Sequence, residues 1–317
     1  MTKEETGDDA GLRRWLEAAG AQLSDAALTR TMLSLSPGER MTLGEHWPLW
    51  TNPGQEEPPG DWRVWLMMAG RGFGKTRAGA EWVSARARET SGARIALVGA
   101  SVEEVVKVMV KGQSGLIAVA RTGEEPAWLA SKGELRWPNG AIGFAYSGAR
   151  PDKLRGPEHH FAWCDELAKW RQAQASWDTL MMGLRLGEAP RTMVTTTPRP
   201  ITALKTIIGL ERTVTTGGRT ADNPHLPEDY QLGMARMYGG SRLGRQELDG
   251  HLFEDAAGAL WTRALIEASR QSGSPARGGA EARGRRRRSA GERGRGCVRD
   301  RRVRAGARRI GLCARRP

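Results

Sequence analysis

"AGRGFGKT", residues 69–76, is the stretch that decides the fold of this 317-residue chain. It matches the phosphate-binding pattern G-x-x-x-x-G-K-[ST], except that alanine stands at the first position. In such a loop the backbone N–H groups point toward phosphate oxygens, and the following helix adds the positive end of its dipole. We expect Lys75 to reach the β- and γ-phosphates of ATP and Thr76 to hold Mg²⁺. The alternative is an ordinary glycine-rich turn between a strand and a helix.

The segments on either side of the loop favour the phosphate-binding interpretation. The preceding run WRVWLMMA (62–69) is apolar and typical of a buried strand, and KTRAGAEWVSARARE (75–89) has the composition and apolar spacing of a helix. Glycines in the loop permit its tight curvature. The residues predicted to contact the nucleotide from this loop are Gly70, Arg71, Gly72, Phe73, Gly74, Lys75 and Thr76.

Strand and helix patterns alternate further along the chain. A hairpin is predicted over 134–148, around the turn residues Pro138-Asn139-Gly140. A helix is predicted over 101–112, with Ser101 and Glu104 spaced as a capping box. Further strands are predicted at 93–100, 159–166, 191–198 and 211–217. This alternation predicts an α/β fold, a P-loop NTPase core whose mainly parallel sheet is flanked by helices.

A second candidate motif is HFAWCDEL (160–167), an apolar strand that ends in two adjacent carboxylates. Asp165 is expected to bind Mg²⁺, and Glu166 to polarise the attacking water as a general base. Taken alone, two acids after a strand more often cap the next helix. Together with the loop at 69–76 they indicate ATP hydrolysis with a built-in base.

Two further features have both a functional and a structural interpretation. VTTTP (194–198) ends a strand in three hydroxyl groups, and Thr195, Thr196 and Thr197 are candidates to contact the γ-phosphate because ligands bind at the carboxyl ends of parallel strands. Threonine also simply favours strands. Arg71 is a candidate to stabilise the transferring phosphoryl group within the same subunit, a task that an arginine of a neighbouring subunit could perform instead. A solvated loop arginine is the alternative.

Charge is distributed very unevenly. The net charge of +13 and the pI of about 10.4 would suggest a nucleic-acid binder. Residues 271–317 hold 16 arginines and three acidic residues, so the whole excess lies there and residues 1–270 are neutral. Three scattered cysteines, no apolar stretch of about 20 residues and an acidic N-terminus predict a cytoplasmic protein with no membrane segment.

Four stretches together resemble a known family. They are GDWRVWLMMAGRGFGKTRAGAEW, SGARPDKLRGPEHHFAWCDELAKW, MVTTTPRP and ADNPHLPEDYQLGMARMYGGSRLGRQELDGHLFEDAAGALW. They resemble the large terminase subunit of tailed phages and prophages, and most of all the group that includes gene transfer agent packaging proteins. The resemblance covers roughly residues 40–266 and is specific because several motifs occur in order.

The resemblance implies roles for individual residues. Gln55 would contact the adenine of ATP, Lys75 and Thr76 the phosphates and Mg²⁺, Asp165 the Mg²⁺, and Glu166 would be the catalytic base. Residues 195–198 would couple hydrolysis to movement, and Arg71 matches the arginine inside the loop. Ala69 is a mild departure from the pattern.

The resemblance also implies a function, an ATPase motor that pushes double-stranded DNA through a portal into a procapsid. Its partners would be the portal protein and the small terminase subunit. It would form a homo-oligomeric ring when docked, in the host cytoplasm and transiently at the procapsid portal. Two alternatives stay open, another P-loop DNA translocase or helicase, and a protein without activity, either an inactive prophage remnant or a docking protein.

The predicted organisation has three parts. Residues 1–50 form an N-terminal helical segment, residues 51–266 the ATPase domain with 221–266 closing it, and residues 267–317 a disordered tail rich in Arg, Gly and Ala. The family continues into an RNase H-like nuclease, whereas this tail lacks acidic residues after apolar strands, so we expect no nuclease activity in this chain. A shifted reading frame through GC-rich codons is favoured over an evolved nucleic-acid arm.

Overall fold

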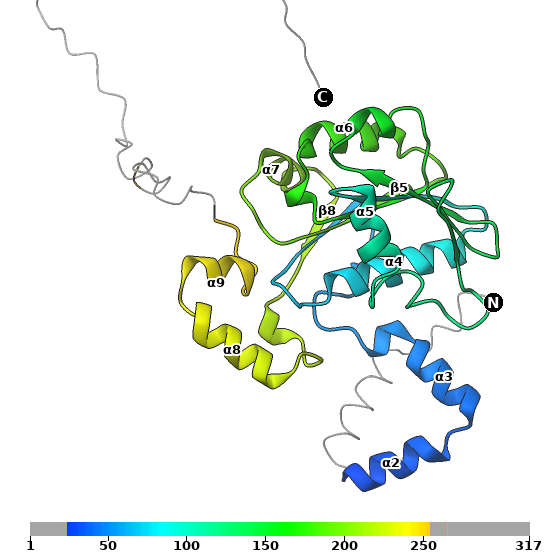
Figure 1. The fold of residues 1–317 in the computed structure, drawn as a ribbon, viewed down its shortest axis with the longest axis vertical. Helices are drawn as coiled ribbons and strands as arrows, with labels where there is room; N and C mark the ends of the chain where they lie inside the picture. The colour runs from blue at the N-terminus through cyan, green and yellow to red at the C-terminus, as the bar shows by residue number, and fades with distance from the viewer. Residues whose placement is uncertain (1–23, 254–264, 266–317) are drawn as a thin grey trace, which may run out of the picture. The chain divides into compact units, whose positions relative to one another are not determined.

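The sheet at the centre of the fold has the strand order β3-β4-β5-β2-β6-β7-β1-β8 (Figure 1). The computed structural model describes residues 24–253 and residue 265. Within that part of the chain the strands are β1 (Val64–Met68), β2 (Arg94–Gly99), β3 (Ala127–Leu129), β4 (Glu134–Arg136), β5 (Ile142–Ser147), β6 (Phe161–Asp165), β7 (Arg191–Thr196) and β8 (Thr213–Thr216).

Helices connect most of these strands. The α-helices of the described residues are α2 (Asp25–Ser34), α3 (Pro37–Glu45), α4 (Lys75–Glu89), α5 (Val102–Glu104), α6 (Ala173–Gly183), α7 (Thr202–Ile208), α8 (Glu228–Tyr238) and α9 (Arg242–Glu247). A π-helical segment, η2, spans Val105–Val110. Short 3-10 helices are η1 (Trp47–Leu49), η3 (Pro151–Leu154), η4 (Leu167–Lys169) and η5 (Thr220–Asp222).

The strands from β5 to β8 in that order are parallel, while β3 and β4 add an antiparallel edge. This arrangement confirms the predicted α/β class with a mainly parallel sheet. The hairpin predicted around Pro138-Asn139-Gly140 is also confirmed, because β4 and β5 pair antiparallel across that turn. No described helix is both long and apolar enough to span a lipid bilayer.

The register of the central strands determines where the predicted motifs meet. Asp165 at the end of β6 pairs with Thr195 in β7, and Met68 at the end of β1 pairs with Thr196. The carboxyl ends of β1, β6 and β7 therefore lie at one edge of the sheet, where parallel sheets bind ligands.

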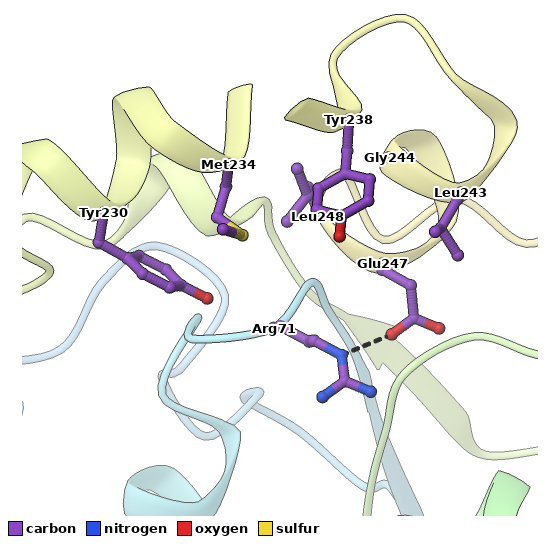
Figure 2. Close-up of a pocket in the computed structure, with 8 residues that line it drawn as sticks. All are labelled: Arg71, Tyr230, Met234, Tyr238, Leu243, Gly244, Glu247 and Leu248. Atoms are coloured by element: carbon purple, nitrogen blue, oxygen red, sulfur yellow. Dashed lines mark hydrogen bonds and ion pairs between the residues drawn. The ribbon is translucent and has the colours of Figure 1, made fainter. Parts of the chain in front are cut away.

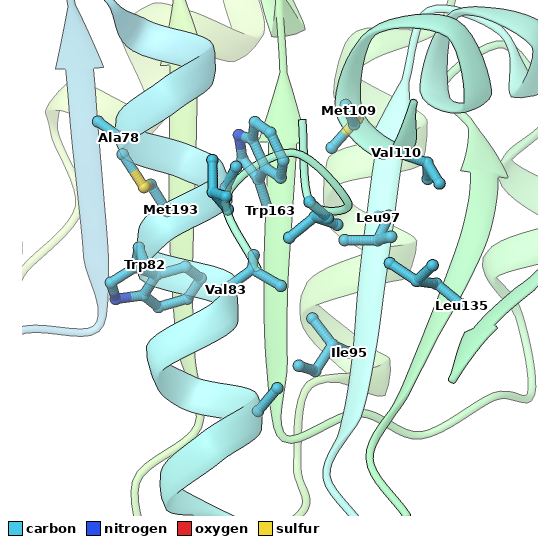
Figure 3. Close-up of a cluster of buried hydrophobic side chains, with 14 of the residues drawn as sticks. Ala78, Trp82, Val83, Ile95, Leu97, Met109, Val110, Leu135, Trp163 and Met193 are labelled. Carbon is cyan, nitrogen blue, oxygen red and sulfur yellow. The ribbon is translucent and has the colours of Figure 1, made fainter. Parts of the chain in front are cut away.

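Both faces of the central strands are buried, because apolar side chains point alternately to each side along them. On β1, Trp65 and Met67 belong to one core cluster, while Val64 and Leu66 belong to the other. Figure 3 shows the first cluster, in which α4 and η2 cover one face of the strands. Helices α6 and α7 supply side chains to the second cluster on the opposite face. Burial on two faces explains why the strands read as continuous apolar runs.

The helix predicted over 101–112 is confirmed for residues 102–110, but only Val102–Glu104 of it is α-helical. Ser101 caps the start by accepting a hydrogen bond from the Glu104 N–H at 3.1 Å, but the chain then widens into the π-helical segment η2. Val105, Met109 and Val110 are all buried. A π turn allows residues five apart to share one face, which accounts for the burial of Val105 and Val110 together.

The predicted parts at the two ends of the chain are covered only in part. Between residues 24 and 50 the structure has α2, α3 and η1, and the predicted division of the chain into three parts stays a prediction. Residues 1–23 and the predicted tail, 267–317, lie outside the described residues. The expectations of a disordered tail and of a missing nuclease domain therefore stay predictions.

A buried histidine precedes β6. His159 is 1% exposed, and its Nε2 lies 3.1 Å from the hydroxyl of Tyr146. Burial raises the pKa of Tyr146 to about 12, so the phenol keeps its proton at neutral pH. Burial, aided by the charges of Arg94 and His160, lowers the pKa of His159 to about 4. We infer that His159 is neutral in the folded protein at pH 7.

The lowered pKa of His159 predicts that the free energy of unfolding depends on pH. Unfolded His159 would titrate near its ordinary pKa of 6.5, so between pH 6.5 and 4 the unfolded chain binds more protons and folding is disfavoured as the pH falls. We expect the free energy of unfolding to drop by up to about 3 kcal/mol over this range relative to a His159→Gln variant. Chemical denaturation of both proteins at pH 7, 5.5 and 4 measures this difference. Asp165 and His160 titrate in both proteins, so their contributions cancel, and parallel curves would contradict the prediction.

Candidate functional site

The loop at 69–76 joins β1 to α4 at the carboxyl edge of the sheet. Gly74 caps the helix with φ 100°, and Gly72 has φ 75°, both in the left-handed region that favours glycine. Helix α4 begins at Lys75, so its N-terminal N–H groups face the loop, as the phosphate-binding interpretation requires.

Lys75 is almost fully buried inside this loop. Its Nζ donates hydrogen bonds to the carbonyl oxygens of Ala69 and Gly70, each at 3.0 Å. Burial lowers the pKa of Lys75, whereas the nearby carboxylates of Glu166 and Asp165 act in the opposite direction. The lysine is thus held among loop carbonyls, with two acids close enough to influence its charge.

Gln55 lies directly behind the loop and is 3% exposed. Its side-chain Nε2 donates to the carbonyl of Phe73 at 2.8 Å, and its Oε1 accepts from the N–H of Asn52 at 2.8 Å. A Cβ atom on Gly74 would lie 2.3 Å from Nε2. In this structure both ends of the amide bind main-chain groups, so Gln55 supports the loop's conformation. Contact with adenine stays a prediction from the resemblance.

The aspartate of the acidic pair is buried. Asp165 is 8% exposed, and its Oδ1 accepts a hydrogen bond from the hydroxyl of Thr195 at 2.7 Å. Burial, and then the charge of Glu166, raises the pKa of Asp165 to about 6, although Thr195 and Lys75 oppose the shift. A cation beside this carboxyl would stabilise its charged form.

The glutamate of the pair has an unusual backbone. Glu166 adopts φ 49° and ψ 45°, a left-handed conformation that costs of order 1 kcal/mol for a residue with a side chain. Its carboxylate lies 3.6 Å from Lys169 Nζ and 3.5 Å from the N–H of Thr197, and its side chain is 22% exposed. The kink at the end of β6 thus separates the two acids, one buried and one open to water.

The three threonines at the end of β7 and just after it are all buried, and two of them use their hydroxyls within the protein. Thr195 binds Asp165, while Thr196 accepts from the N–H of Ala168 at 3.2 Å and donates to the carbonyl of Thr197 at 3.1 Å. The sequence predicted that these hydroxyls would face a phosphate. In this structure they connect the end of β7 to the end of β6 and to η4, and a phosphate contact stays a prediction.

Arg71 lies at the outer side of the loop, as Figure 2 shows, with its guanidinium directed at α9. Its Nε is 2.7 Å from Oε2 of Glu247, and this ion pair raises the pKa of Arg71, with a smaller contribution from Glu166. The backbone N–H of Arg71 also donates to the carbonyl of Glu247 at 2.7 Å. The guanidinium is therefore held by the closing segment in this structure, not by the loop.

An apolar cavity of about 330 Å³ lies beside this ion pair. Arg71 lines one side of it. The other lining residues belong to α8, to α9 and to the position after α9, namely Tyr230, Met234, Tyr238, Leu243, Gly244, Glu247 and Leu248 (Figure 2).

Residues that the sequence analysis did not single out fix the loop from outside. Thr220 donates its hydroxyl proton to the carbonyl of Arg71 at 2.7 Å, and Asn223 donates to the carbonyl of Gly72 at 2.6 Å. A Cβ atom on Gly70 would lie 2.1 Å from the carbonyl oxygen of Leu248. Thr220, Asn223 and Leu248, like Glu247, lie in the predicted closing segment or just before it, but the sequence analysis assigned no individual role to any of them.

The oxygen donors at the site fit Mg²⁺. Thr76 is in the first turn of α4 and is half-buried, and Asp165 offers a buried carboxylate whose Oδ1 is held by Thr195. Among the residues described, no three His, Cys, Asp or Glu side chains cluster as a self-sufficient metal site. Mg²⁺ commonly takes only one or two protein ligands and completes its shell with phosphates and water, which matches this donor set.

Solved structures of large terminases align with this chain. The large terminase of a thermophilic bacteriophage aligns with a TM-score of 0.51 and 12% identity, covering 67% of this chain and 52% of that one. The HK97 bacteriophage large terminase aligns with a TM-score of 0.48 and 17% identity, over 69% and 50% of the two chains. The ATPase domain of the Thermus phage P74-26 large terminase aligns with a TM-score of 0.48 and 16% identity, covering 73% of this chain and 98% of that one. The chain thus spans about half the length of the first of these proteins.

Sequence comparison gives the family. No curated protein sequence matches this chain. The model of the N-terminal part of the T4likevirus-type terminase large subunit matches residues 66–268, which is more than half of the chain and includes the loop, the acidic pair and the threonines. This protein therefore belongs to the terminase large subunit family.

Proposed function

We propose that this chain is the ATP-hydrolysing motor subunit of a terminase and translocates double-stranded DNA into a viral or gene transfer agent procapsid. The main support is the register of β1, β6 and β7, which brings Lys75, Asp165 and Glu166 to one edge of the sheet in a member of this family. The large terminase of the thermophilic bacteriophage, which is similar in fold, has been solved with ADP and with ATP-γ-S.

In the proposed mechanism the loop binds the triphosphate. Lys75 exchanges the carbonyls of Ala69 and Gly70 for β- and γ-phosphate oxygens, which favour its charged form. Thr76 and Asp165 would hold Mg²⁺, which neutralises charge on the β- and γ-phosphates when it is bound. The N–H groups at the start of α4 complete the anion site.

Glu166 is the proposed general base. Its side chain is partly open to water, while the N–H of Thr197 and the ammonium of Lys169 lie near one carboxylate oxygen. The other oxygen can accept the proton of the attacking water. Arg71 would leave Glu247 and contribute positive charge to the transferring phosphoryl group, so the closing segment that carries Glu247 would respond to the state of the nucleotide.

The proposed partners follow from this activity. They are double-stranded DNA, the portal protein and the small terminase subunit, with further copies of this chain in a ring at the portal. The site of action would be the host cytoplasm and, transiently, the procapsid portal.

The experiment that tests the proposal measures ATP turnover with Mg²⁺ in three conditions. The protein is assayed alone, with linear double-stranded DNA, and with DNA plus portal-bearing procapsids. We expect DNA to stimulate turnover and procapsids to stimulate it further. Equal stimulation with and without the portal would instead favour a helicase or repair translocase. Absence of turnover in all three conditions would indicate an inactive remnant.

A further inference from the structure

A buried tryptophan is the start of a hydrogen-bond chain that ends at the proposed magnesium ligand. Trp163 in β6 is fully buried, and its indole Nε1 donates to the hydroxyl oxygen of Thr195 at 2.9 Å. That hydroxyl lies 2.7 Å from Oδ1 of Asp165. The three side chains come from two neighbouring strands, β6 and β7, which are paired at Asp165 and Thr195.

The donor rules give this chain a direction. An indole N–H can only donate, so the Thr195 oxygen must accept from Trp163. The threonine then has one proton left to donate. Asp165 Oδ1 at 2.7 Å is a far better acceptor for it than the carbonyl of Cys164, which is 3.5 Å away. Trp163 therefore anchors the hydroxyl oxygen of Thr195, while the proton of that hydroxyl points to the carboxylate.

The position of the indole is itself fixed by the helix that follows the phosphate-binding loop. Gly79 of α4 faces the ring closely enough that a Cβ atom there would lie 2.2–2.5 Å from the indole atoms Cε2, Cζ2 and Nε1. Gly79 lies one helical turn after Thr76, the other proposed oxygen ligand. The two candidate magnesium ligands are thus connected through a glycine contact, an indole and a hydroxyl.

We propose that Trp163 is a positioning residue for the cation. Through Thr195 it holds Oδ1 of Asp165, so that the other carboxylate oxygen is oriented toward Mg²⁺ at the nucleotide phosphates. This inference rests on the proposed ATPase function. It assigns a task to a residue in which sequence reasoning finds only a core aromatic, and it gives Thr195 a role beside the cation, not at the γ-phosphate.

The chain offers a matched control. Trp65 in β1 is also buried, and its Nε1 donates to the hydroxyl of Thr216 on a neighbouring strand at 2.8 Å. That hydroxyl donates to the backbone carbonyl of Gly54, not to a carboxylate. Trp65→Phe and Trp163→Phe therefore each replace a buried indole by a phenyl ring and each remove one tryptophan–threonine hydrogen bond. Only Trp163→Phe breaks a chain of hydrogen bonds that leads to Asp165.

The experiment measures binding of Mn²⁺, as a spectroscopic substitute for Mg²⁺, to the protein with a non-hydrolysable ATP analogue by electron paramagnetic resonance. We expect Trp163→Phe to weaken Mn²⁺ binding by about tenfold or more, the usual effect of losing a residue that orients a metal ligand. Trp65→Phe should lose a similar amount of thermal stability and keep the wild-type Mn²⁺ affinity. Equal Mn²⁺ affinity in both variants would overturn the inference.

A second pair of variants covers the case in which Trp163→Phe does not fold. Thr195→Ser keeps a hydroxyl between the indole and the carboxylate, and should keep most of the Mn²⁺ affinity. Thr195→Val keeps the shape without the hydroxyl, and should weaken Mn²⁺ binding as Trp163→Phe does. If the Thr195→Val and Thr195→Ser variants bind Mn²⁺ equally, the hydrogen-bond chain does not position the carboxylate. Failure of the wild-type protein to bind Mn²⁺ with the nucleotide would instead contradict the proposed function itself.

Discussion

Lys75→Ala is expected to abolish ATP hydrolysis. The change removes a buried cation inside the loop whose Nζ lies 3.0 Å from two loop carbonyls, where β- and γ-phosphate oxygens would compete for it. A charge that acts on the transferring phosphoryl group is worth several kcal/mol in the transition state, so turnover should fall by at least about a hundredfold. A steady-state assay of phosphate release with saturating Mg²⁺ and ATP measures this.

The control for this prediction is a lysine in a different environment. Lys107 in η2 is exposed and pairs with Glu103 one turn away, so Lys107→Ala should keep wild-type turnover. Thermal unfolding of both variants separates loss of catalysis from loss of folding. If folded Lys75→Ala kept more than about a tenth of the wild-type turnover, the assignment of this loop to the phosphates would be wrong.

The sequence predicted the central sheet because local and long-range preferences agree there. Helix α4 begins and ends at the predicted residues, since the glycines before Lys75 and the helix formers after it point to the same structure. The continuous apolar runs correctly predicted strands buried on both faces. The segment after β2 differed because Val105 and Val110, five residues apart, are buried together, a spacing that an α-helix does not place on one face.

Side-chain partners within the site were much less predictable. The hydroxyl of Thr195 donates to Asp165 and accepts from the indole of Trp163, which is 32 residues away in sequence, and no local pattern reports either bond. Likewise, Arg71 binds Glu247, 176 residues further along the chain, in a segment where the sequence predicted no role for any single residue. Residue types indicated which chemistry this edge of the sheet can perform, whereas hydrogen-bond directions depend on packing between distant elements.

Glu166→Gln is expected to leave nucleotide binding intact and to slow hydrolysis by about a hundredfold or more, the usual contribution of a general base. Glutamine keeps the shape of the side chain and its strained backbone, φ 49°, so the end of β6 should not rearrange. An amide oxygen is too weak a base to take a proton from water. The direct metal ligand proposed here, Asp165, is unchanged in this variant.

A glutamate at the opposite end of the same strand serves as the control. Glu158 lies before β6 and pairs with Arg185 away from the carboxyl edge, so Glu158→Gln should keep both binding and turnover. Nucleotide affinity is measured by calorimetry with ATP-γ-S, and hydrolysis by single-turnover phosphate release, which separates the chemical step from product release. For Glu166→Gln we expect unchanged affinity and a slow chemical step, because the negative charge lost is needed only when the water is deprotonated. A parallel loss of affinity and rate would mean that Glu166 holds the cation or the backbone, and the base would then have to be sought elsewhere at this edge of the sheet.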